Sequence, residues 1–212
     1  MSYSGLVGVD WEERINFPRM RQERLARAQE AMRRNDVDVL LLFRWENTRY
    51  TTGLRYVPVP NSPFEHCASY VAVKRDGEPI VFTMDIEDTK LRAPWIPERN
   101  LQPHQYVQTE FGAKALAQAL KELSLAGGRL GVDLWEPTTL DVLREGLQTT
   151  RLVNGQRVMM DARMVKTRDE IECLKAAYSI GEAALQAGLE CLKPGTRECE
   201  VQAAIWQRAV SL

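Results

Sequence analysis

The sequence contains little of what several classes of protein require. It has no run of about 18 apolar residues, which a membrane-spanning helix would need. The N-terminal segment MSYSGLVGVDWEERINFPRM is too acidic, and its apolar run too short, for a secretory signal peptide. A formal net charge of −1 over 212 residues provides no basic field to attract a polyanion. We therefore expect a protein that binds neither a membrane nor nucleic acid.

Cysteine and histidine are also scarce. No CxxC pair exists, so the sequence predicts reduced thiols in a cytoplasmic protein rather than a disulfide framework. Neither His66 nor His104 has a second ligand at the helical spacing of a metal site. His66 is interpreted as an ordinary loop or strand-start residue, or else as a substrate contact, and His104 as a surface-loop residue. The four cysteines are Cys67, Cys173, Cys191 and Cys199.

Several catalytic and cofactor motifs are missing. Gly5 and Gly8 have no strand before them and no third glycine after them, which excludes a dinucleotide-binding fingerprint. The GxSxG elbow of serine hydrolases is absent. Asp85, Glu87 and Asp88 are close enough together to bind a hard cation. A solvated loop at a helix start is the favoured interpretation of these carboxylates.

Along the rest of the sequence, helical patterns alternate with strand patterns, and one β-hairpin interrupts the alternation. Apolar residues three and four apart predict an amphipathic helix through Leu25, Ala28 and Met32. The unbroken apolar run from Val39 to Phe43 predicts a strand buried on both faces. This alternation indicates a mixed-sheet α/β domain from about Glu12 to about Asp161. The other predictions are a hairpin within 69–83, a helix at 111–126 closed by Gly127-Gly128, a strand at 129–135, a helix opening at Pro137 and a last strand at 156–167.

The stretch FRWENTRYTTGLRYVPVPNSPFEH, residues 43–66, gathers aromatic and guanidinium side chains. We interpret it as a polar loop at the end of a strand, with a sharp turn at Gly53. Such loops often bind ligands. The alternative is that Trp45 and Tyr50 pack beneath the loop while its arginines are solvated.

The last segment predicts a helical hairpin. Thr167 and Glu170 fit a capping box at the start of its first helix, and Lys193-Pro194-Gly195 ends that helix. One seam carries apolar residues and two glycines at spacings of three and four, which indicates close approach of a broad partner such as a sheet. Thr196 is expected to cap the second helix. The seam residues are Ile171, Leu174, Tyr178, Gly181, Leu185, Gly188 and Leu192, with Val201, Ile205 and Leu212 on the second helix.

Three motifs in order resemble the creatinase/prolidase family. ENTRYTTGL is similar to its Asn-x-x-Tyr-x-[Ser/Thr]-Gly element. ARMVKTRDEIECLKAA resembles its Arg-x-x-Lys-[Ser/Thr]-x-x-Glu-[Ile/Leu] element, and LKPGTRECEVQAAI its Pro-Gly turn before the next helix. The matching residues are Asn47, Tyr50, Thr52 and Gly53; Arg163, Lys166, Thr167, Glu170 and Ile171; and Pro194, Gly195 and Val201, with Glu198 and Glu200 near the acidic positions.

The resemblance implies a two-part organisation. Residues 1–161 correspond to the family's N-terminal α/β domain. Residues 162–212 correspond to the first helices of its catalytic pita-bread domain, which pack on a curved sheet. The family's catalytic domain binds two divalent metals (Mn, Co or Zn) through two aspartates, a histidine and two glutamates. All five ligand positions fall past residue 212, so the resemblance implies a partial, truncated chain that holds no metal and is inactive alone.

The resemblance also implies a function for the longer protein. The first possibility is a metal-dependent Xaa-Pro aminopeptidase or dipeptidase that acts on small peptides. The alternative is a creatinase-like hydrolase, or a lyase, acting on a small charged substrate. In this family the N-terminal domain serves homodimer formation and substrate access, and in some members it lends substrate contacts to the neighbouring subunit. The candidates for such contacts are Arg55, Tyr56, Phe64 and His66.

Overall fold

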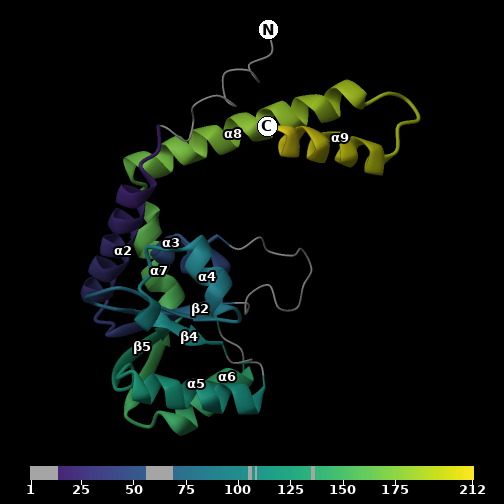
Figure 1. The fold of residues 1–212 in the computed structure, drawn as a ribbon. Coiled ribbons are helices and arrows are strands. Elements are labelled where there is room, and N and C mark those ends of the chain that lie inside the picture. The colour runs from purple at the N-terminus through teal and green to yellow at the C-terminus, as the bar shows by residue number, and fades with distance from the viewer. Residues whose placement is uncertain (1–13, 56–68, 105–106, 108, 135–136) are drawn as a thin grey trace. The chain divides into compact units, whose positions relative to one another are not determined.

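The computed structural model describes residues 14–55, 69–104, 107, 109–134 and 137–212 (Figure 1). The chain divides into two compact units. The described residues within 21–165 form the sheet-containing unit, and residues 14–20 with residues 166–212 form the helical unit. That residues 1–161 and 162–212 are separate folding domains remains a prediction.

The predicted mixed sheet is confirmed, and it has six strands in the sheet-containing unit. The strand order is β4-β3-β2-β1-β5-β6. β2 is antiparallel to both of its neighbours, β1 and β3, and the other pairs are parallel. The strands are β1 (Val39–Leu42), β2 (Ser69–Lys74), β3 (Ile80–Thr83), β4 (Leu101–Pro103), β5 (Gly128–Val132) and β6 (Thr150–Asn154).

Helices bury both faces of this sheet. On one face Leu41 and Leu130 pack with side chains of α5 (Glu110–Glu122) and α6 (Pro137–Gly146). On the other face Leu40 and Leu42 pack with side chains of α2 (Phe17–Arg34), α3 (Trp45–Thr52) and α7 (Gly155–Met164). Neighbouring residues of β1 thus enter opposite cores, as the unbroken apolar run predicted. Two short helices, α4 (Ile86–Arg92) and η1 (Glu98–Asn100), link β3 to β4.

The predicted hairpin and two predicted helix starts are confirmed. β2 and β3 are joined through a turn in which Gly77 has φ 88°. Asp85 is the N-cap of α4, and its side chain accepts a hydrogen bond from the Asp88 backbone N–H. Pro137 is the first residue of α6. The 85–88 carboxylates therefore start a helix, as the favoured interpretation held.

The segment after β1 is a helix, and the prediction of a polar loop there was wrong. α3 ends at Gly53, which caps it in the left-handed conformation with φ 73°. The Thr51 and Thr52 hydroxyls donate to carbonyls one turn earlier in the helix, so the polar residues are satisfied locally. Tyr50 is buried, whereas Trp45 is 38% exposed.

Residues 156–167 were predicted as the last strand, and this was also wrong. They lie mostly in α7, and the last strand is β6. Val158, Met159 and Ala162 form a helical stripe against the core. Asn154 accepts a hydrogen bond from the Arg157 backbone N–H and so starts the helix one residue after the strand ends. The apolar pair Val158-Met159 suggested a strand, but in the structure it lies on the buried side of a helix.

The helix predicted to close at Gly127-Gly128 ends earlier. α5 stops at Glu122, and Ser124 takes the left-handed conformation with φ 54°. Gly127 and Gly128 also have positive φ values, but they lead into β5. The glycines therefore shape the start of a strand, while the serine reverses the chain after the helix.

The helical unit contains the predicted hairpin, α8 (Arg168–Cys191) and α9 (Glu198–Ser211), which lie side by side (Figure 1). The capping box of Thr167 and Glu170 is confirmed. Thr196 does not cap α9. Its hydroxyl donates to the Cys191 carbonyl and accepts from the Lys193 N–H, and Arg197 is the N-cap. The threonine therefore closes the turn one residue before the helix begins.

Close approach at a seam glycine occurs at only one of the two positions. A Cβ added to Gly188 would lie 2.6 Å from Ile205 of α9, whereas one added to Gly181 would meet nothing within 4 Å. At the start of α8, Arg19 donates two hydrogen bonds of 2.8 Å to Asp169, whose carboxylate also accepts from the Asn16 backbone. These bonds hold the first turn of α8 within the helical unit.

Candidate functional site: a polar cluster at the carboxyl ends of the parallel strands

Polar side chains meet where three parallel strands end. β1 is followed by Phe43 and Arg44, β5 by Asp133, and β6 by Gly155 and α7. The carboxyl edge of parallel strands is where open α/β sheets commonly bind ligands. We call Asn47, Asp133, Gln156 and Arg163, which are joined there by hydrogen bonds, the carboxyl-end cluster.

Asp133 lies at the centre of the cluster and is 3% exposed. Its carboxylate accepts hydrogen bonds from the backbone N–H of Phe43 at 2.8 Å and of Arg44 at 3.2 Å, and from Asn47 Nδ2 at 2.8 Å. Burial raises the pKa of Asp133 to about 6, and these hydrogen bonds partly oppose that rise. Because these three donors come from the segment that leads into α3 and from α3 itself, the carboxylate anchors the start of α3 to the end of β5.

Asn47 links Asp133 to the last helix of the unit. Its Nδ2 also donates to Gln156 Oε1 at 2.7 Å, and its Oδ1 accepts from Arg163 Nη1 at 2.9 Å. Asn47 is fully buried, and both its amide protons and its carbonyl oxygen have partners. Its side chain therefore holds β5, α3 and α7 together.

Two glycines let the backbone approach closely enough for this network. A Cβ added to Gly155 would lie 2.7 Å from the carbonyl carbon of Gly131 and 2.8 Å from the Val132 nitrogen. Backbone atoms cannot move aside as the end of a flexible side chain can. The first turn of α7 thus crosses directly over β5, which brings Gln156 within reach of Asn47.

The hydrogen bond between Asn47 and Arg163 joins two of the three family motifs, ENTRYTTGL and ARMVKTRDEIECLKAA, and a second hydrogen bond joins the same two. Tyr50 Oη donates to the Ala162 carbonyl at 3.1 Å in the core. At the end of α3 the Leu54 N–H donates to Thr52 Oγ1 at 3.0 Å. In the Asn-x-x-Tyr-x-Thr-Gly pattern, Asn47 and Tyr50 thus bond to α7. The Thr52 hydroxyl accepts a hydrogen bond at the end of α3, and Gly53 is the left-handed cap. Arg163, from the other motif, is the residue that Asn47 holds.

An ion pair lies at the edge of the cluster. Arg44 Nε is 2.7 Å from Glu46 Oε1. Burial alone would raise the pKa of Glu46, but the hydrogen bond from Arg44, a backbone hydrogen bond and the charge of Arg44 outweigh it, with a smaller effect from Arg163, so the pKa is lowered. The hydrogen bond to Glu46 raises the pKa of Arg44 in turn. Glu46 therefore remains ionised at neutral pH.

The chemistry of the cluster favours holding the chain over reacting with a substrate. Its carboxylate accepts three hydrogen bonds from the protein, and its amides and guanidinium bond to one another. Over the described ranges, no group of three or more His, Cys, Asp or Glu side chains is placed to hold a metal ion. The cluster thus offers positioning groups, and the described side chains do not provide the donor set of a metal centre.

Of the four predicted substrate contacts, the structure describes one. Arg55 is exposed and follows α3. Burial, followed by the charge of Arg55, lowers the pKa of the nearby Arg21. The Arg21 guanidinium lies 3.8 Å from the centroid of Trp95, whose indole N–H donates to the Thr52 carbonyl at 2.8 Å. The other three candidates, Tyr56, Phe64 and His66, lie outside the described residues.

His104 directly follows β4 and is half-buried. It lies in the loop segment that was predicted, and its ring centroid is 5.2 Å from that of Tyr70, so the side chain also contacts the core. Cys173, Cys191 and Cys199 are free thiols, and Cys67 lies outside the described residues. No helix in the described ranges is long and apolar enough to cross a membrane.

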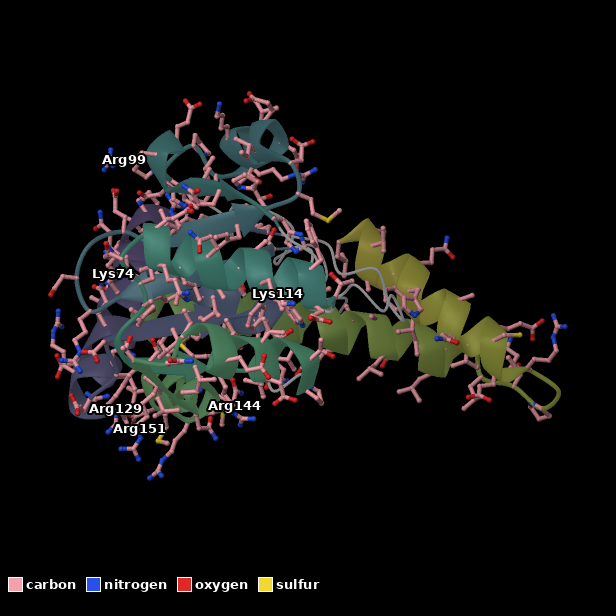
Figure 2. The ribbon with its side chains drawn as sticks, turned by 90° about the horizontal axis from the view of Figure 1, so that it is seen from below. Lys74, Arg99, Lys114, Arg129, Arg144 and Arg151 are labelled. Atoms are coloured by element: carbon pink, nitrogen blue, oxygen red, sulfur yellow. The ribbon has the colours of Figure 1, made fainter. Side chains whose placement is uncertain are left out.

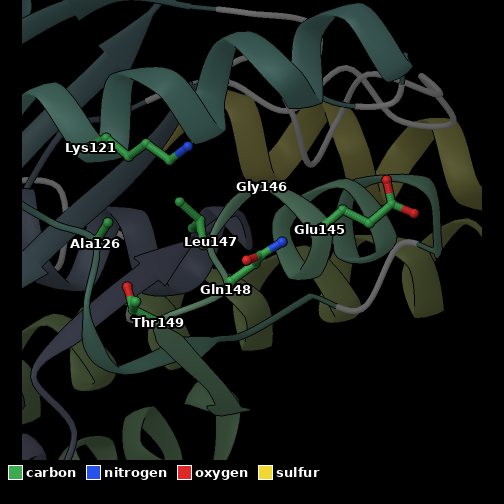
Figure 3. A pocket seen from close by; sticks show the side chains of 7 residues that line it. All are labelled: Lys121, Ala126, Glu145, Gly146, Leu147, Gln148 and Thr149. Atoms are coloured by element: carbon green, nitrogen blue, oxygen red, sulfur yellow. The ribbon is translucent and has the colours of Figure 1, made fainter.

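A separate hollow lies at the other end of the parallel strands (Figure 3). It is open, has a volume of about 500 Å³ and lies between the segments that lead into β5 and β6. Its ionisable side chains are Lys121 and Glu145. One lysine and one glutamate on the wall of an open hollow do not indicate a particular reaction. The lining residues are Lys121, Ala126, Glu145, Gly146, Leu147, Gln148 and Thr149.

Basic side chains are spread over several elements (Figure 2). Arg99 lies 3.1 Å from Glu78, Lys114 2.5 Å from Glu110 of its own helix, and Arg144 3.1 Å from Asp141. Because these cations are paired with neighbouring acids, they do not combine into one strongly basic surface.

The architecture defines the class of protein: an α/β domain on a mixed six-stranded sheet, of the kind found in prolidases. A Xaa-Pro dipeptidase from Bacillus anthracis superposes with a TM-score of 0.65 at 20% identity, over 90% of this chain and 49% of that one. Prolidase from Pyrococcus furiosus superposes with a TM-score of 0.64 at 19% identity, over 87% and 52%.

Sequence comparison identifies the family. The Creatinase/Prolidase N-terminal domain matches residues 24–165, and the chain belongs to this family. An uncharacterized hydrolase/peptidase of Sinorhizobium fredii is 23% identical over 198 residues, which are 90% of this chain and 50% of the relative. Creatinase of a Bacillus species is 25% identical over 185 residues, 84% and 42% respectively. The chain thus spans about half the length of these relatives.

Proposed function

We propose that this chain is the N-terminal portion of a metal-dependent hydrolase of the Xaa-Pro aminopeptidase or dipeptidase type. The observation that carries the proposal is the match of the Creatinase/Prolidase N-terminal domain over residues 24–165. Relatives named as a hydrolase/peptidase and a Xaa-Pro dipeptidase share most of this chain and extend to about twice its length. In this proposal the catalytic centre lies outside the 212 residues.

The two divalent metals that the family implies need a donor set that the described residues do not offer. No group of three carboxylate, imidazole or thiolate side chains converges in those ranges, whereas a tight zinc site needs at least three. We therefore assign no step of the reaction to this chain. Its role in the proposal is to shape access to the substrate and to support assembly of a homodimer.

The group of Arg21, Arg55 and Trp95 is the described part of the proposed access surface. A guanidinium stacked on an indole leaves N–H groups in its plane that can bind a carboxylate. Arg55 adds a second positive charge, whose effect reaches Arg21. This chemistry fits the carboxylate of a small peptide. Charge reversal by Arg55→Glu should then raise KM for a Xaa-Pro dipeptide and leave kcat nearly unchanged.

The alternative function is that of a creatinase-like hydrolase or a lyase acting on a small charged molecule. It is favoured by the likeness to creatinase of a Bacillus species, and the same cationic surface would bind such a substrate. The two functions differ in the substrate consumed, which makes them separable in one assay.

The test compares the 212-residue chain with a polypeptide translated through the codon for Leu212 into the following reading frame. We expect the longer protein to hydrolyse a Xaa-Pro dipeptide when supplied with Mn²⁺, and the shorter chain to have no activity. Calorimetric titration of the shorter chain with Mn²⁺ should show no site tighter than about millimolar. A stoichiometric micromolar site in the 212 residues, or consumption of creatine in place of the dipeptide, would overturn the proposal.

A further inference from the structure

The Asn47 side chain in the carboxyl-end cluster lies between a carboxylate and a guanidinium. Its Nδ2 donates to Asp133 and to Gln156 Oε1, and its Oδ1 accepts from Arg163 Nη1. An ionised carboxylate can only accept hydrogen bonds, and a guanidinium can only donate them. The charges at its two ends therefore fix the orientation of the Asn47 amide.

The three hydrogen-bond partners that the described residues give Asp133 are all donors. They are the backbone N–H groups of Phe43 and Arg44, and Asn47 Nδ2. A protonated Asp133 brings an O–H among these donors, and none of the three offers it an acceptor while Asn47 keeps its orientation. Taking up the proton therefore sacrifices hydrogen bonds unless a neighbouring group turns round.

Asn47 is the partner that can supply an acceptor by turning. Rotation of its amide by 180° exchanges Nδ2 and Oδ1 with almost no change of shape, so the turned amide fits the same buried space. Oδ1 then accepts from the Asp133 O–H, and the half-buried Gln156 can turn its own amide to donate to the same oxygen. Nδ2 then faces Arg163, and two donors do not bond.

Arg163 is able to leave when the amide turns. Its side chain is half-buried near the end of α7, whereas Asn47 and Asp133 are buried. Water can hydrate the guanidinium once Asn47 no longer accepts from it. The carboxylate of Glu46, whose pKa the charge of Arg163 already lowers, also attracts it.

We propose that Asp133, Asn47 and Arg163 form a pH-sensitive switch within the folded chain. Above the transition the ionised carboxylate orients the Asn47 amide, which holds Arg163 and with it the last turn of α7. Below the transition the carboxyl group has gained one proton and donates it to Asn47 Oδ1 in a hydrogen bond. The amide is then reversed, and Arg163 is released.

Burial places the transition close to neutral pH. It raises the pKa of Asp133 to about 6, although the three hydrogen bonds and the charge of Arg44 oppose the rise. The ordinary pKa of the group is 3.8, so between about pH 4 and 6 the folded state binds this proton and the unfolded state does not. Protonation of Asp133 over that range stabilises the folded state, and the change stays within it.

Few charged groups act on Asp133. From the start of α3, Arg44 lowers its pKa, and Glu46 forms an ion pair with Arg44. The pKa of Glu46 is lowered, so this pair persists through the transition. From α7, Arg163 lies on the other side of the Asn47 amide, and Asp161 pairs with Arg34. The other charged residues of α3, α6, β6 and α7 are exposed: Arg49, Asp141, Arg144, Glu145, Arg151 and Arg157.

Nuclear magnetic resonance of the full 212-residue chain, titrated between about pH 7.5 and 4.5, tests the switch. We expect the signals of the Asp133 carboxyl carbon, the Asn47 side-chain amide and the Arg163 Nε–H to move together, with one midpoint near pH 6. Arg19 is the internal control. Its partner Asp169 has a lowered pKa and stays ionised over this range, so the Arg19 Nε–H signal should not move.

A variant that mimics the protonated acid sharpens the test. Asp133→Asn is neutral and has nearly the shape of the carboxylic acid, so it should keep the Arg163 signal at its low-pH position throughout the titration. Asp161→Asn is the matched control, because it removes an α7 carboxylate that pairs with Arg34. It should leave the midpoint unchanged.

Three outcomes would overturn the switch. The first is titration of Asp133 while the Asn47 and Arg163 signals stay constant. The second is an Asp133 carboxyl signal that does not titrate in this range. The third is an Arg163 signal in Asp133→Asn, at unchanged circular dichroism, that matches the wild type at pH 7.5. None of these measurements uses substrate or metal, so the switch and the proposed hydrolysis are decided separately.

Discussion

The carboxyl-end cluster buries polar groups in the sheet-containing unit, whereas α8 in the helical unit exposes apolar side chains such as Leu174, Tyr178 and Leu185. In the cluster, burial is tolerated because Asp133 and Asn47 have hydrogen-bond partners for their buried polar atoms. On α8, exposure forgoes burial worth about 1.5–3 kcal/mol for each large apolar side chain. The comparison teaches that the sheet-containing unit pairs its buried polar groups with one another, whereas the folding of the α8–α9 hairpin leaves apolar side chains of α8 exposed.

The largest effect should follow removal of the residue that links the cluster. Asn47→Ala leaves Asp133 without one donor and Gln156 and Arg163 without their partners. We expect the free energy of unfolding to fall by about 3–4 kcal/mol, since buried polar groups lose their hydrogen bonds. Urea denaturation measures it. Asn100→Ala, which removes a single bond to the Pro79 carbonyl, should cost about 1 kcal/mol or less, and equal losses would contradict the role of the network.

The buried carboxylate should give the chain a distinctive pH dependence. The folded pKa of Asp133 is raised from 3.8 to about 6, so the folded state binds this proton more tightly than the unfolded state. The stabilisation is fully present below about pH 4 and is lost as pH rises through 6, a change of about 2–3 kcal/mol. Stability curves of the wild type and Asp133→Asn, subtracted from one another, isolate this group. A flat difference between pH 4 and 7 would show that the carboxyl titrates normally.

Glycine-to-alanine substitutions test how tightly the backbone is packed in each unit. Gly155→Ala sets a Cβ against the β5 backbone, and we expect it to destabilise the chain by about 2–3 kcal/mol. Gly181→Ala lies in open space within α8 and should stabilise it by roughly 0.5–1 kcal/mol through helix propensity. Thermal unfolding of both variants checks the signs. Similar destabilisation at the two positions would refute the difference in packing.

The smallest expected effect is selective cleavage of the chain between the two units. Lys166 is exposed between α7 and the cap of α8, whereas Arg163 lies within α7 and donates to Asn47. Brief trypsin treatment should therefore cut first after Lys166 and leave residues 21–165 protected. First cleavage elsewhere in the described chain, identified by mass spectrometry, would place the weakest segment away from the predicted domain boundary.

Local pattern was sufficient for much of the fold. The three- and four-residue spacing of α2, the apolar run of β1 and the Thr167–Glu170 capping box each have one dominant local interpretation. Predictions were wrong at α3 and α7, where the local pattern was ambiguous. A polar segment rich in threonine was interpreted as a loop, and a short apolar pair as a strand, because the core contacts of Tyr50 and Val158 are not visible in sequence.

The residues of the carboxyl-end cluster were also only partly recognisable from the sequence. Asn47 and Arg163 stood out from the sequence as family motif residues, but nothing local showed that they touch. Asp133 and Gln156 were missed. An aspartate directly after a buried run is the signal that could have marked Asp133, since the carboxyl ends of parallel strands share one edge.

The sequence by itself determined the family, the mixed α/β class and the terminal hairpin, because periodicity, caps and ordered motifs are local properties of the chain. Only the tertiary structure decided that Asp133, Asn47 and Arg163 form one network, and that α9 covers Gly188 while apolar side chains elsewhere on α8 stay exposed. The reason is physical. Hydrogen bonds between residues 86 and 116 positions apart, and the exposure of one side of a helix, depend on which segments pack together.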